Sequence, residues 1–287
     1  MKFAVHRKQL TFLLVLSALL GFGSATAAEQ EPTLPTARKF DEFGDVYPTD
    51  MAARLDNFAV ALQTEPNARG FLIVYRSHRD LPGLSGRHVS WMRRYLVDLR
   101  GIAPDRIATV DGGEASCLSH ELWLVPVGAT PTPRADAYSR GLDDEGAAYK
   151  FDEYYWDAPH ELPESFSTEY GGALEVYAEA LRKEPRALAY VIVYAGYRVT
   201  RTEDVDARGR KKIFREAWLD PPGTAARKLT ETKETLKRQG ISPARVRLVN
   251  GGYRRWRHIE LWIVPPGENP PVPTPNAFPP KRTTRRK

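Results

Sequence analysis

The sequence predicts an α+β protein made of two tandem copies of one small domain. Four short blocks occur twice in the same order. In the first half they are Lys-Phe-Asp-Glu at 39–42, Ile-Val-Tyr at 73–75, Val-Asp-Gly-Gly at 110–113 and Glu-Leu-Trp-Leu-Val-Pro at 121–126. Their counterparts begin at positions 150, 192, 249 and 260, with Asn for Asp in the glycine block and Ile for Leu in the last block. This repetition indicates a duplication, so the two halves should share one fold.

The spacing between matching blocks predicts where the two copies differ. The offset is 119 residues for the Ile-Val-Tyr block and 139 residues for the glycine block. The second copy therefore carries about 20 extra residues between these blocks, and we place them in a loop. The predicted organisation is a signal peptide (1–28), the first copy (38–128), a linker (129–148), the second copy (149–267) and a proline-rich basic tail (268–287).

Each copy is expected to have the element order β-α-β-α-β-β, as a small mixed sheet with two helices on one face. In the first helix, Leu55, Phe58, Ala59 and Leu62 follow the i, i+3, i+4, i+7 spacing that puts apolar groups on one side. We expect Asp50 to cap this helix, because its carboxylate can accept free N–H groups of the first turn.

The remaining elements follow from short apolar runs and glycines. Residues 71–75 are apolar throughout, a run too short for a helix and typical of a central strand. A second helix is expected at 86–99, ended by Gly101 in the left-handed conformation. Strands are expected at 106–110 and 121–125, with the glycine block as a turn after the former. The second copy repeats this series.

The first 28 residues have the pattern of a secretory signal. Three basic residues precede an apolar run at 10–22, and Ala-Thr-Ala at 25–27 fits a cleavage site. The alternative, an uncleaved membrane anchor, needs roughly 20 apolar residues, more than this run provides. We therefore expect a chain secreted to the periplasm or cell envelope, without a transmembrane span after cleavage.

Charge and cysteine content exclude several classes of protein. The formal charge is +6, but three cations lie in the signal and five at the C-terminus, so residues 28–280 hold 34 basic and 36 acidic groups. Such a balance does not fit nucleic-acid binding. Cys117 is the only cysteine, either a reactive or intermolecular thiol or a loop residue without a special role. With no Cys/His cluster at metal-ligand spacing, no metal or cofactor is expected.

The tail combines many prolines with a cluster of five cations at its end. This composition cannot bury a core, so we expect an extended and disordered segment. Its basic end is either solvated or in contact with an anionic polymer.

The order and spacing of these elements resemble the C-terminal peptidoglycan-binding domain of outer-membrane protein A, the OmpA-like domain. The matching features are Phe-Asp-Glu-Phe-Gly at 40–44, Leu-Asp-Asn-Phe-Ala at 55–59, Leu-Ile-Val at 72–74, Gly-Ile at 101–102 with Asp-Arg-Ile at 105–107, and Val-Asp-Gly-Gly-Glu at 110–114. The second copy gives Gly-Ile at 240–241, Ala-Arg-Val at 244–246 and Val-Asn-Gly-Gly at 249–252.

This resemblance implies a binding module rather than an enzyme. The family holds the diaminopimelate of the wall peptide with an Asp after the second strand and an Arg early in the following helix. The Arg position falls on His88 in the first copy, with Arg87 beside it, and on Lys228 in the second, with Arg227 beside it. Asp80 lies two residues beyond the Asp position. A guanidinium clamps a carboxylate well, and an Asp can pair the ammonium group.

Two pairs of interpretations stay open at these sites. Asp80 and Arg87 are the sharpest pair for wall-peptide binding; alternatively they are a loop acid and a surface arginine. Trp123 and Trp262 alternate with aliphatic residues along the last strand, which puts them on the sheet face opposite the helices. That face either contacts a protein or glycan, or is covered by the linker or the other copy.

Catalysis has little support in this sequence. It lacks a Gly-x-Ser-x-Gly elbow and a His-Glu-x-x-His motif, and His120 and His258, which precede the last strand of each copy, look structural. We therefore expect a non-enzymatic envelope protein that contacts peptidoglycan or a neighbouring envelope protein. The alternative is a protein–protein scaffold of the envelope in which the wall site has been lost.

Overall fold

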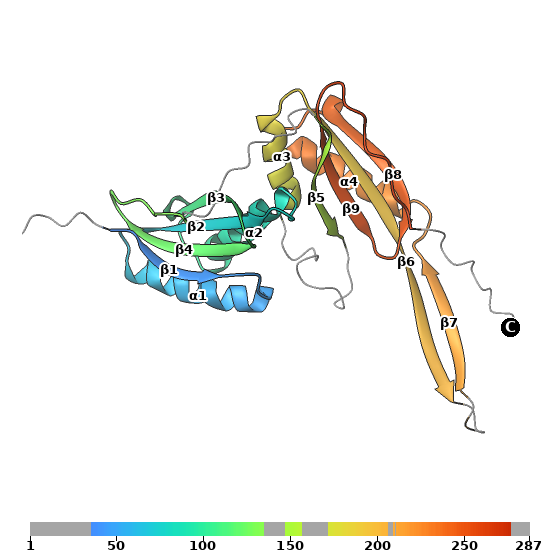
Figure 1. Cartoon of the computed structure of the whole chain (residues 1–287), viewed down its shortest axis with the longest axis horizontal. Coiled ribbons are helices and arrows are strands. Elements are labelled where there is room, and N and C mark those ends of the chain that lie inside the picture. The colour runs from blue at the N-terminus through green and yellow to red at the C-terminus, as the bar shows by residue number, and fades with distance from the viewer. Residues whose placement is uncertain (1–35, 135–146, 157–171, 206–208, 210, 277–287) are drawn as a thin grey trace, which may run out of the picture. The chain divides into compact units, whose positions relative to one another are not determined.

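The computed structural model describes residues 36–134, 147–156, 172–205, 209 and 211–276 (Figure 1). The expected signal peptide, residues 135–146 of the linker and the basic end of the tail lie outside the described residues. Within the described part, none of the helices combines the length and the apolar character that crossing a membrane requires.

The first copy has the predicted order of elements. They are β1 (Arg38–Phe43), α1 (Pro48–Thr64), β2 (Ala68–Ser77), α2 (Gly83–Arg94), β3 (Ile107–Ala115) and β4 (Ser119–Pro126). The strands form a sheet in the order β1-β4-β2-β3, in which only β2 and β3 are parallel. A π-helical turn, Tyr95–Leu99, continues α2. The prediction of a small mixed sheet is therefore confirmed.

The second copy repeats this arrangement and adds one strand. Its elements are β5 (Tyr149–Tyr155), α3 (Ala173–Lys183), β6 (Leu188–Val205), β7 (Lys211–Leu219), α4 (Thr224–Arg238), β8 (Val246–Arg254) and β9 (His258–Val264). The order β5-β9-β6-β8 matches that of the first sheet.

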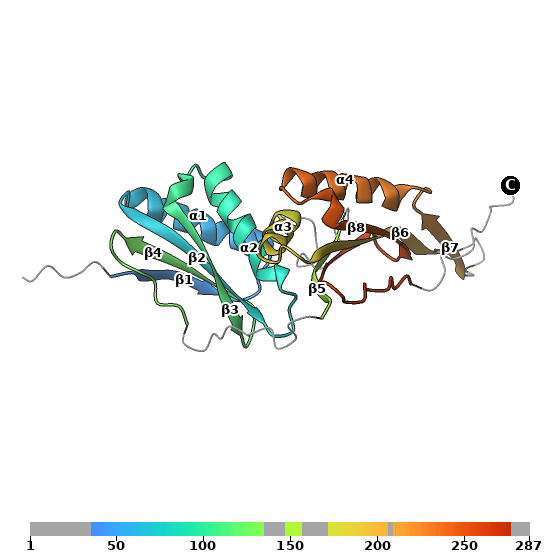
Figure 2. The ribbon, with the colours of Figure 1, turned by 90° about the horizontal axis from the view of Figure 1, so that it is seen from above.

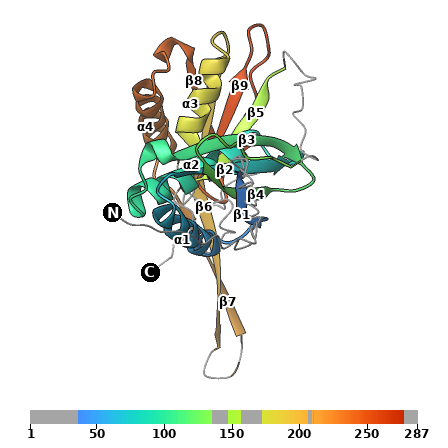
Figure 3. The ribbon, with the colours of Figure 1, turned by 90° about the vertical axis from the view of Figure 1, so that its left-hand side faces the viewer.

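The extra residues of the second copy form a hairpin, not the loop that we expected. The outer half of β6 continues past the sheet and pairs with β7, from Tyr197 opposite Leu219 to Val205 opposite Lys211 (Figure 3). Pairing satisfies the backbone N–H and C=O groups of a long excursion, which a structureless loop would leave to water. This requirement explains why the prediction of a loop was wrong.

The two faces of the first sheet have the composition that the alternation predicts. Both helices lie on one side of the sheet (Figure 2). The predicted apolar face of α1 is buried and packs with Leu72, Val74, Leu122 and Leu124 of the sheet. The opposite face carries a separate cluster of buried residues: Ile73, Tyr75, Ala115, Trp123 and Val125.

The start of α1 differs from the prediction. Tyr47 occupies the N-cap position, and no side chain caps the helix there. Pro48 is the first helical residue, which needs no N–H partner and has its φ already fixed. Asp50 lies inside the first turn, where its charge favours the positive end of the helix. The predicted left-handed glycines at the ends of the second helices are confirmed, with φ of 68° at Gly101 and 83° at Gly240.

The glycine block is part of a strand, so the predicted turn was wrong. In β3 the N–H of Gly113 donates to Asp111 Oδ1 at 3.1 Å, and Gly113 has a φ of 82°. The register of β2 and β3 shifts at this place, which marks a β-bulge. A Cβ on Gly112 would lie 2.4 Å from the Tyr75 ring. The block therefore holds a bulge over a buried tyrosine, and β8 repeats both features at Gly252 and Gly251.

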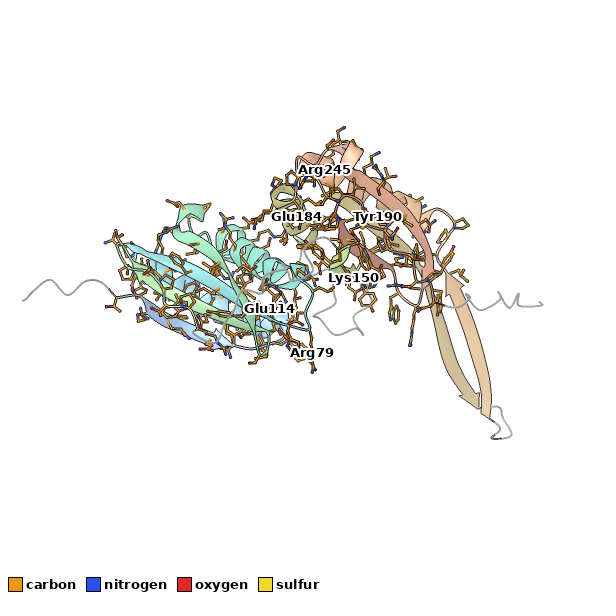
Figure 4. All side chains as sticks on the ribbon, turned by 45° about the horizontal axis from the view of Figure 1, so that its top comes forward. Arg79, Glu114, Lys150, Glu184, Tyr190 and Arg245 are labelled. Carbon is orange, nitrogen blue, oxygen red and sulfur yellow. The ribbon has the colours of Figure 1, made fainter. Side chains whose placement is uncertain are left out.

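The Arg of the Asp-Arg-Ile or Ala-Arg-Val block ties the end of one helix to the sheet. Arg245 Nη2 donates to the carbonyls of Leu181 and Glu184, at 2.9 and 2.7 Å, where α3 ends (Figure 4). In the first copy Arg106 makes the same bonds to the end of α1. The last carbonyls of a helix lack hydrogen-bond donors within the helix, and this arginine supplies those donors.

Candidate functional site

One loop-helix segment has the same chemistry in both copies. Its pattern is Asp-x-Pro-Gly-x-x-x-Arg, beginning at Asp80 before α2 and at Asp220 before α4. Each aspartate accepts a backbone N–H from the central strand of its copy, that of Ser77 in β2 at 2.8 Å and that of Gly196 in β6 at 2.6 Å. These shared bonds make Asp220 the structural counterpart of Asp80. The arginine at the end of each pattern is Arg87 or Arg227.

Arg87 is buried and already paired with a carboxylate. Its Nε lies 2.9 Å from Asp152 Oδ2 on β5, and the two side chains are 5% and 0% exposed. Burial raises the pKa of Asp152 to about 6, while the charge of Arg87 opposes that rise. The guanidinium that the resemblance assigns to a ligand carboxylate thus faces a carboxylate of the second copy.

Small residues let α2 approach the second copy at this pair. A Cβ on Gly83 would lie 2.8 Å from Asp152 Cβ, and one on Gly86 would lie 2.4 Å from Val176 Cγ1. Positions 83, 86 and 87 share one side of the helix. This side of α2 is therefore a packed joint between the two copies. The same side of α4 carries Ala226 and Arg227, which are both exposed.

Asp80 lies apart from this joint. It is half-buried, and Oδ2 accepts the Ser77 N–H. Its charge also acts on Asp45, whose pKa is raised by burial and by Asp80. In the described part of the chain Asp80 and Arg87 form no ion pair with each other. The structure thus does not join the pair that the sequence singled out.

In the second copy the aspartate, not the arginine, is engaged. Arg257, just before β9, holds Asp220 with two bonds: Nη2 to Oδ1 at 2.8 Å and Nε to Oδ2 at 2.9 Å. This bidentate geometry is the strong form of an arginine–carboxylate pair.

Arg227 and Lys228 lie in the first turn of α4. Arg227 is exposed, and its Nη2 donates to Thr224 Oγ1 at 3.2 Å. Lys228 Nζ is 2.8 Å from Glu231 Oε1 and lies 5.5 Å from the centre of the Trp156 ring. Arg227 is thus open to an anion from solvent, while Lys228 has local partners.

His88 belongs to a buried histidine pair rather than to an accessible site. Its Nδ1 lies 2.8 Å from His120 Nε2, and neither side chain is exposed. Burial lowers the pKa of His120 to about 4 and that of His88 well below its ordinary value. Both rings are therefore neutral at pH 7, and the pair fills space between helix and sheet.

The two histidines near the last strands are not equivalent, although both precede the same block. Strand pairing aligns Glu121 with Glu260, so His120 corresponds to Ile259 and His258 to Ser119. His120 points to the helices, whereas His258 lies on the other face of its sheet, with Nε2 3.2 Å from Glu153 Oε2.

The repeated blocks meet in one polar network on the face opposite the helices. In the first copy the buried Glu121 accepts three bonds, from Lys39 Nζ at 2.7 Å, Trp123 Nε1 at 2.9 Å and Tyr75 Oη at 3.0 Å. These donors come from three blocks, and the fourth block gives the glycine under the Tyr75 ring. The sequence therefore contained the residues of this network, although we interpreted the blocks as signs of duplication and of a family resemblance and not as a network.

The second copy has the same network with one more cation. Glu260 accepts bonds from Lys150, Tyr194 and Trp262 at 3.2–3.3 Å, and Arg254 Nη2 lies 2.8 Å from Oε1. Positive charges beside it help keep the pKa of Glu260 low although burial acts to raise it.

Glu153, His258 and Glu260 bring potential metal ligands within 4.8 Å of one another. Lys150 Nζ lies between the two carboxylates, 2.8 Å from Glu153 and 3.3 Å from Glu260. Hydrogen bonds from His258 and Lys150 lower the pKa of Glu153 to about 2. The ammonium group supplies the positive charge that these carboxylates require, so the cluster is built as an ion-pair network.

Comparison with known proteins adds no relative. No family model matches the chain, and neither the search of curated proteins nor that of solved structures finds a match. Only the residues of the site itself therefore indicate its chemistry.

Sequence reasoning missed the partners of the candidate residues. Asp220 lies beyond the β6–β7 hairpin, with 23 residues between it and Gly196, whereas only two residues separate Asp80 from Ser77. The repeated Asp-x-Pro-Gly-x-x-x-Arg pattern was the signal that could have found it. No sequence signal pointed to Asp152 as the partner of Arg87.

Proposed function

We propose that this chain is a non-enzymatic scaffold of the cell envelope, in which two OmpA-like domains contact protein partners and the wall-peptide clamp is lost. One observation supports the proposal most directly. In each copy one half of the clamp is already engaged: Arg87 by Asp152, and Asp220 by Arg257.

A zwitterionic wall peptide needs both halves in the same copy. Among the described residues, the halves that have no partner of opposite charge lie in different copies, Asp80 in the first and Arg227 in the second. Releasing Arg87 for a ligand would leave Asp152 buried without its partner, at a cost of about 3–5 kcal/mol. A ligand carboxylate would have to recover that energy, which disfavours binding at the first copy.

A second candidate function is peptidoglycan binding through the second copy alone. It is favoured by the exposure of Arg227 in the first turn of α4, a helix of 15 residues. The positive end of a helix and an open guanidinium together suit a carboxylate. This reading needs no release of a buried group.

Co-sedimentation with purified sacculi separates the two functions. The secreted chain would be compared with Arg227→Ala and with a chain ending at Pro280, which lacks the five terminal cations. For a scaffold, we expect Arg227→Ala to sediment as the wild type does. Any sedimentation should disappear when salt is raised or the cations are removed, because it reflects only attraction between charges.

Specific sedimentation would contradict the scaffold. If Arg227→Ala abolishes sedimentation and the chain ending at Pro280 retains it, the second copy binds the wall. Arg87→Lys is a suitable further control, because it keeps the charge at the joint while removing the planar fork that a carboxylate clamp needs.

A further inference from the structure

The face opposite the helices is covered in each copy by a proline-containing segment of the same chain. The segments are 129–134 after β4 and 268–276 after β9. Each begins with the same turn, in which a glycine with positive φ (86° or 89°) precedes an N–H that donates to the proline ending the strand block. The segments therefore belong to the repeat, which extends beyond the predicted boundaries at 128 and 267.

The two segments bind the same atom of the sheet. The N–H of Arg134 donates to Tyr75 Oη at 3.0 Å, and the N–H of Thr274 donates to Tyr194 Oη at 3.0 Å. A proline precedes the donor in both segments. Each tyrosine is buried and donates in turn to the central glutamate of its network, so its oxygen has an accepting lone pair directed at the segment.

The second segment makes further bonds, mostly through its backbone. Arg254 donates from Nε to the Thr274 carbonyl at 3.1 Å and from Nη2 to Thr274 Oγ1 at 2.5 Å. The N–H of Asn276 donates to the Tyr253 carbonyl at 3.1 Å. The described part of the tail that we expected to be disordered is thus fixed to the sheet. Hydrogen bonds of this kind recognise an extended backbone, and they depend little on whether that segment is joined to the rest of the chain.

A guanidinium lies over the tyrosine ring in both copies but has different origins. In the second copy it is Arg254 of β8, 3.7 Å from the centre of the Tyr194 ring. In the first copy Ala115 takes that position, and the segment itself supplies Arg134, 5.6 Å from the centre of the Tyr75 ring. The first face thus suits a Pro-Arg segment and the second a Pro-Thr segment.

We infer that the second of these faces is a binding groove for an extended proline-containing peptide of a partner protein, and that residues 270–276 occupy it in competition. The binding surface, here called the groove, is formed by Tyr194 Oη, the Tyr253 carbonyl and the Arg254 guanidinium, which hydrogen bond the segment. Prolines on both sides of the residue that donates its N–H, as Pro273 and Pro275 flank Thr274, hold such a peptide in an extended helix before binding, which lowers the entropy lost on binding. This inference deepens the scaffold role and rests on it, because it names the chemistry of the partner.

The tethered segment should weaken binding of any peptide from solution. A short tether gives the internal segment an effective concentration of about a millimolar, so a free peptide must compete with it. Thr274→Pro in the full chain keeps every other residue and removes both the N–H that donates to Tyr194 and the Oγ1 that accepts from Arg254. Because Thr274 is exposed and lies outside helices and strands, the domain should fold unchanged.

Fluorescence anisotropy with a labelled peptide of the sequence 269–276 tests the groove. We expect the Thr274→Pro chain to bind this peptide at least about tenfold more tightly than the wild-type chain, since the internal competitor is weakened. Adding Tyr194→Phe to that chain should cancel the gain. A matched peptide carrying Thr274→Pro should bind neither chain.

Two results would overturn the inference. Equal binding by the wild-type and Thr274→Pro chains would mean that the segment does not compete for a groove. A gain that survives Tyr194→Phe would mean that the peptide binds elsewhere. Neither result bears on the sacculus experiment, where dependence on Arg227 would instead remove the scaffold role itself.

Discussion

The two copies place the same loop-helix pattern in opposite situations. In the first copy the arginine is buried against Asp152 and the half-buried aspartate accepts the Ser77 N–H, whereas in the second the aspartate is held by Arg257 and Arg227 is exposed. Identical residue types at identical spacing therefore have different roles. What differs is the neighbour: α2 packs on the second copy, and the same side of α4 faces solvent.

The largest expected difference between the copies concerns the two matched arginines. Arg87→Ala leaves the Asp152 carboxylate buried without its cation, so we expect a loss of about 3–5 kcal/mol in the free energy of unfolding. Arg227→Ala removes an exposed side chain and should change that energy by no more than about 0.5 kcal/mol. Urea denaturation of both variants measures the contrast. Equal losses would show that the joint at Arg87 carries no special energy.

Lowering the pH should destabilise the first copy more than the second. The folded pKa of His120 is about 4, so the folded state keeps this ring neutral while the unfolded chain takes up a proton below pH 6.5. Stability is therefore full above pH 6.5 and falls toward pH 4, by about 3 kcal/mol from His120 alone. The second copy has Ile259 at this position.

Hydrogen exchange followed by mass spectrometry reads the two copies separately at pH 7 and pH 4.5. We expect protection of α1 and α2 to fall in acid, and the double substitution of His120→Ile with His88→Leu to remove most of that fall, because burial lowers the pKa of both rings. Asp152 acts in the opposite direction, because its raised pKa of about 6 makes folding more favourable as pH drops from 6 toward 4. An acid response unchanged in the double variant would exclude the histidine pair as its source.

Both copies have a glycine in close contact with a buried tyrosine ring, so replacing that glycine should destabilise each copy by the same amount. Gly112→Ala and Gly251→Ala each place a methyl group 2.4 Å from a tyrosine ring that hydrogen bonds hold in place. We expect each to destabilise by about 1–3 kcal/mol through overpacking. Gly44→Ala is the control, because its nearest neighbour would lie 3.8 Å away. Thermal unfolding of the three variants gives the comparison. A Gly251→Ala variant as stable as the wild type would show that the tyrosine of the second network is not held as tightly as that of the first.

The smallest effect should come from removing the hairpin that distinguishes the copies. Replacing 197–219 by His-Arg, the two residues that join Ser77 to Asp80, gives the second copy the connection of the first. The Gly196–Asp220 bond can persist in this variant, since the first copy makes it across two residues. We expect a stability change within about 1 kcal/mol, measured by urea denaturation. A collapse of the fold would show that the hairpin supports its sheet.

Local patterns were enough to predict most of the architecture. The spacing of Leu55, Phe58 and Leu62 fixed the buried side of α1, and the apolar run at 71–75 marked the central strand. The prediction was wrong where packing against a residue distant in the sequence overrode a local backbone preference. The glycine block looked like a turn because glycine favours turns, yet in the fold Gly112 makes room for Tyr75 from another strand.

The sequence indicated where the candidate residues lie along the chain, but it did not indicate their hydrogen-bond and ion-pair partners. Asp80, Arg87, His88, Arg227 and Lys228 all lie near the start of a second helix, as the pattern indicated. Asp80, Arg227 and Lys228 bind groups three residues away, but the partners of His88 and Arg87 lie 32 and 65 residues away in the sequence, at His120 and Asp152.

The sequence by itself determined that the chain is a duplication, the order of its elements and which face of each element is apolar, because these follow from periodicity and backbone preference within a few residues. Only the tertiary structure decided which charges are free. An ion pair forms between side chains brought together by packing, and its strength depends on the water excluded around it. No local pattern in the sequence therefore indicated that Asp152 would pair with Arg87, or Arg257 with Asp220.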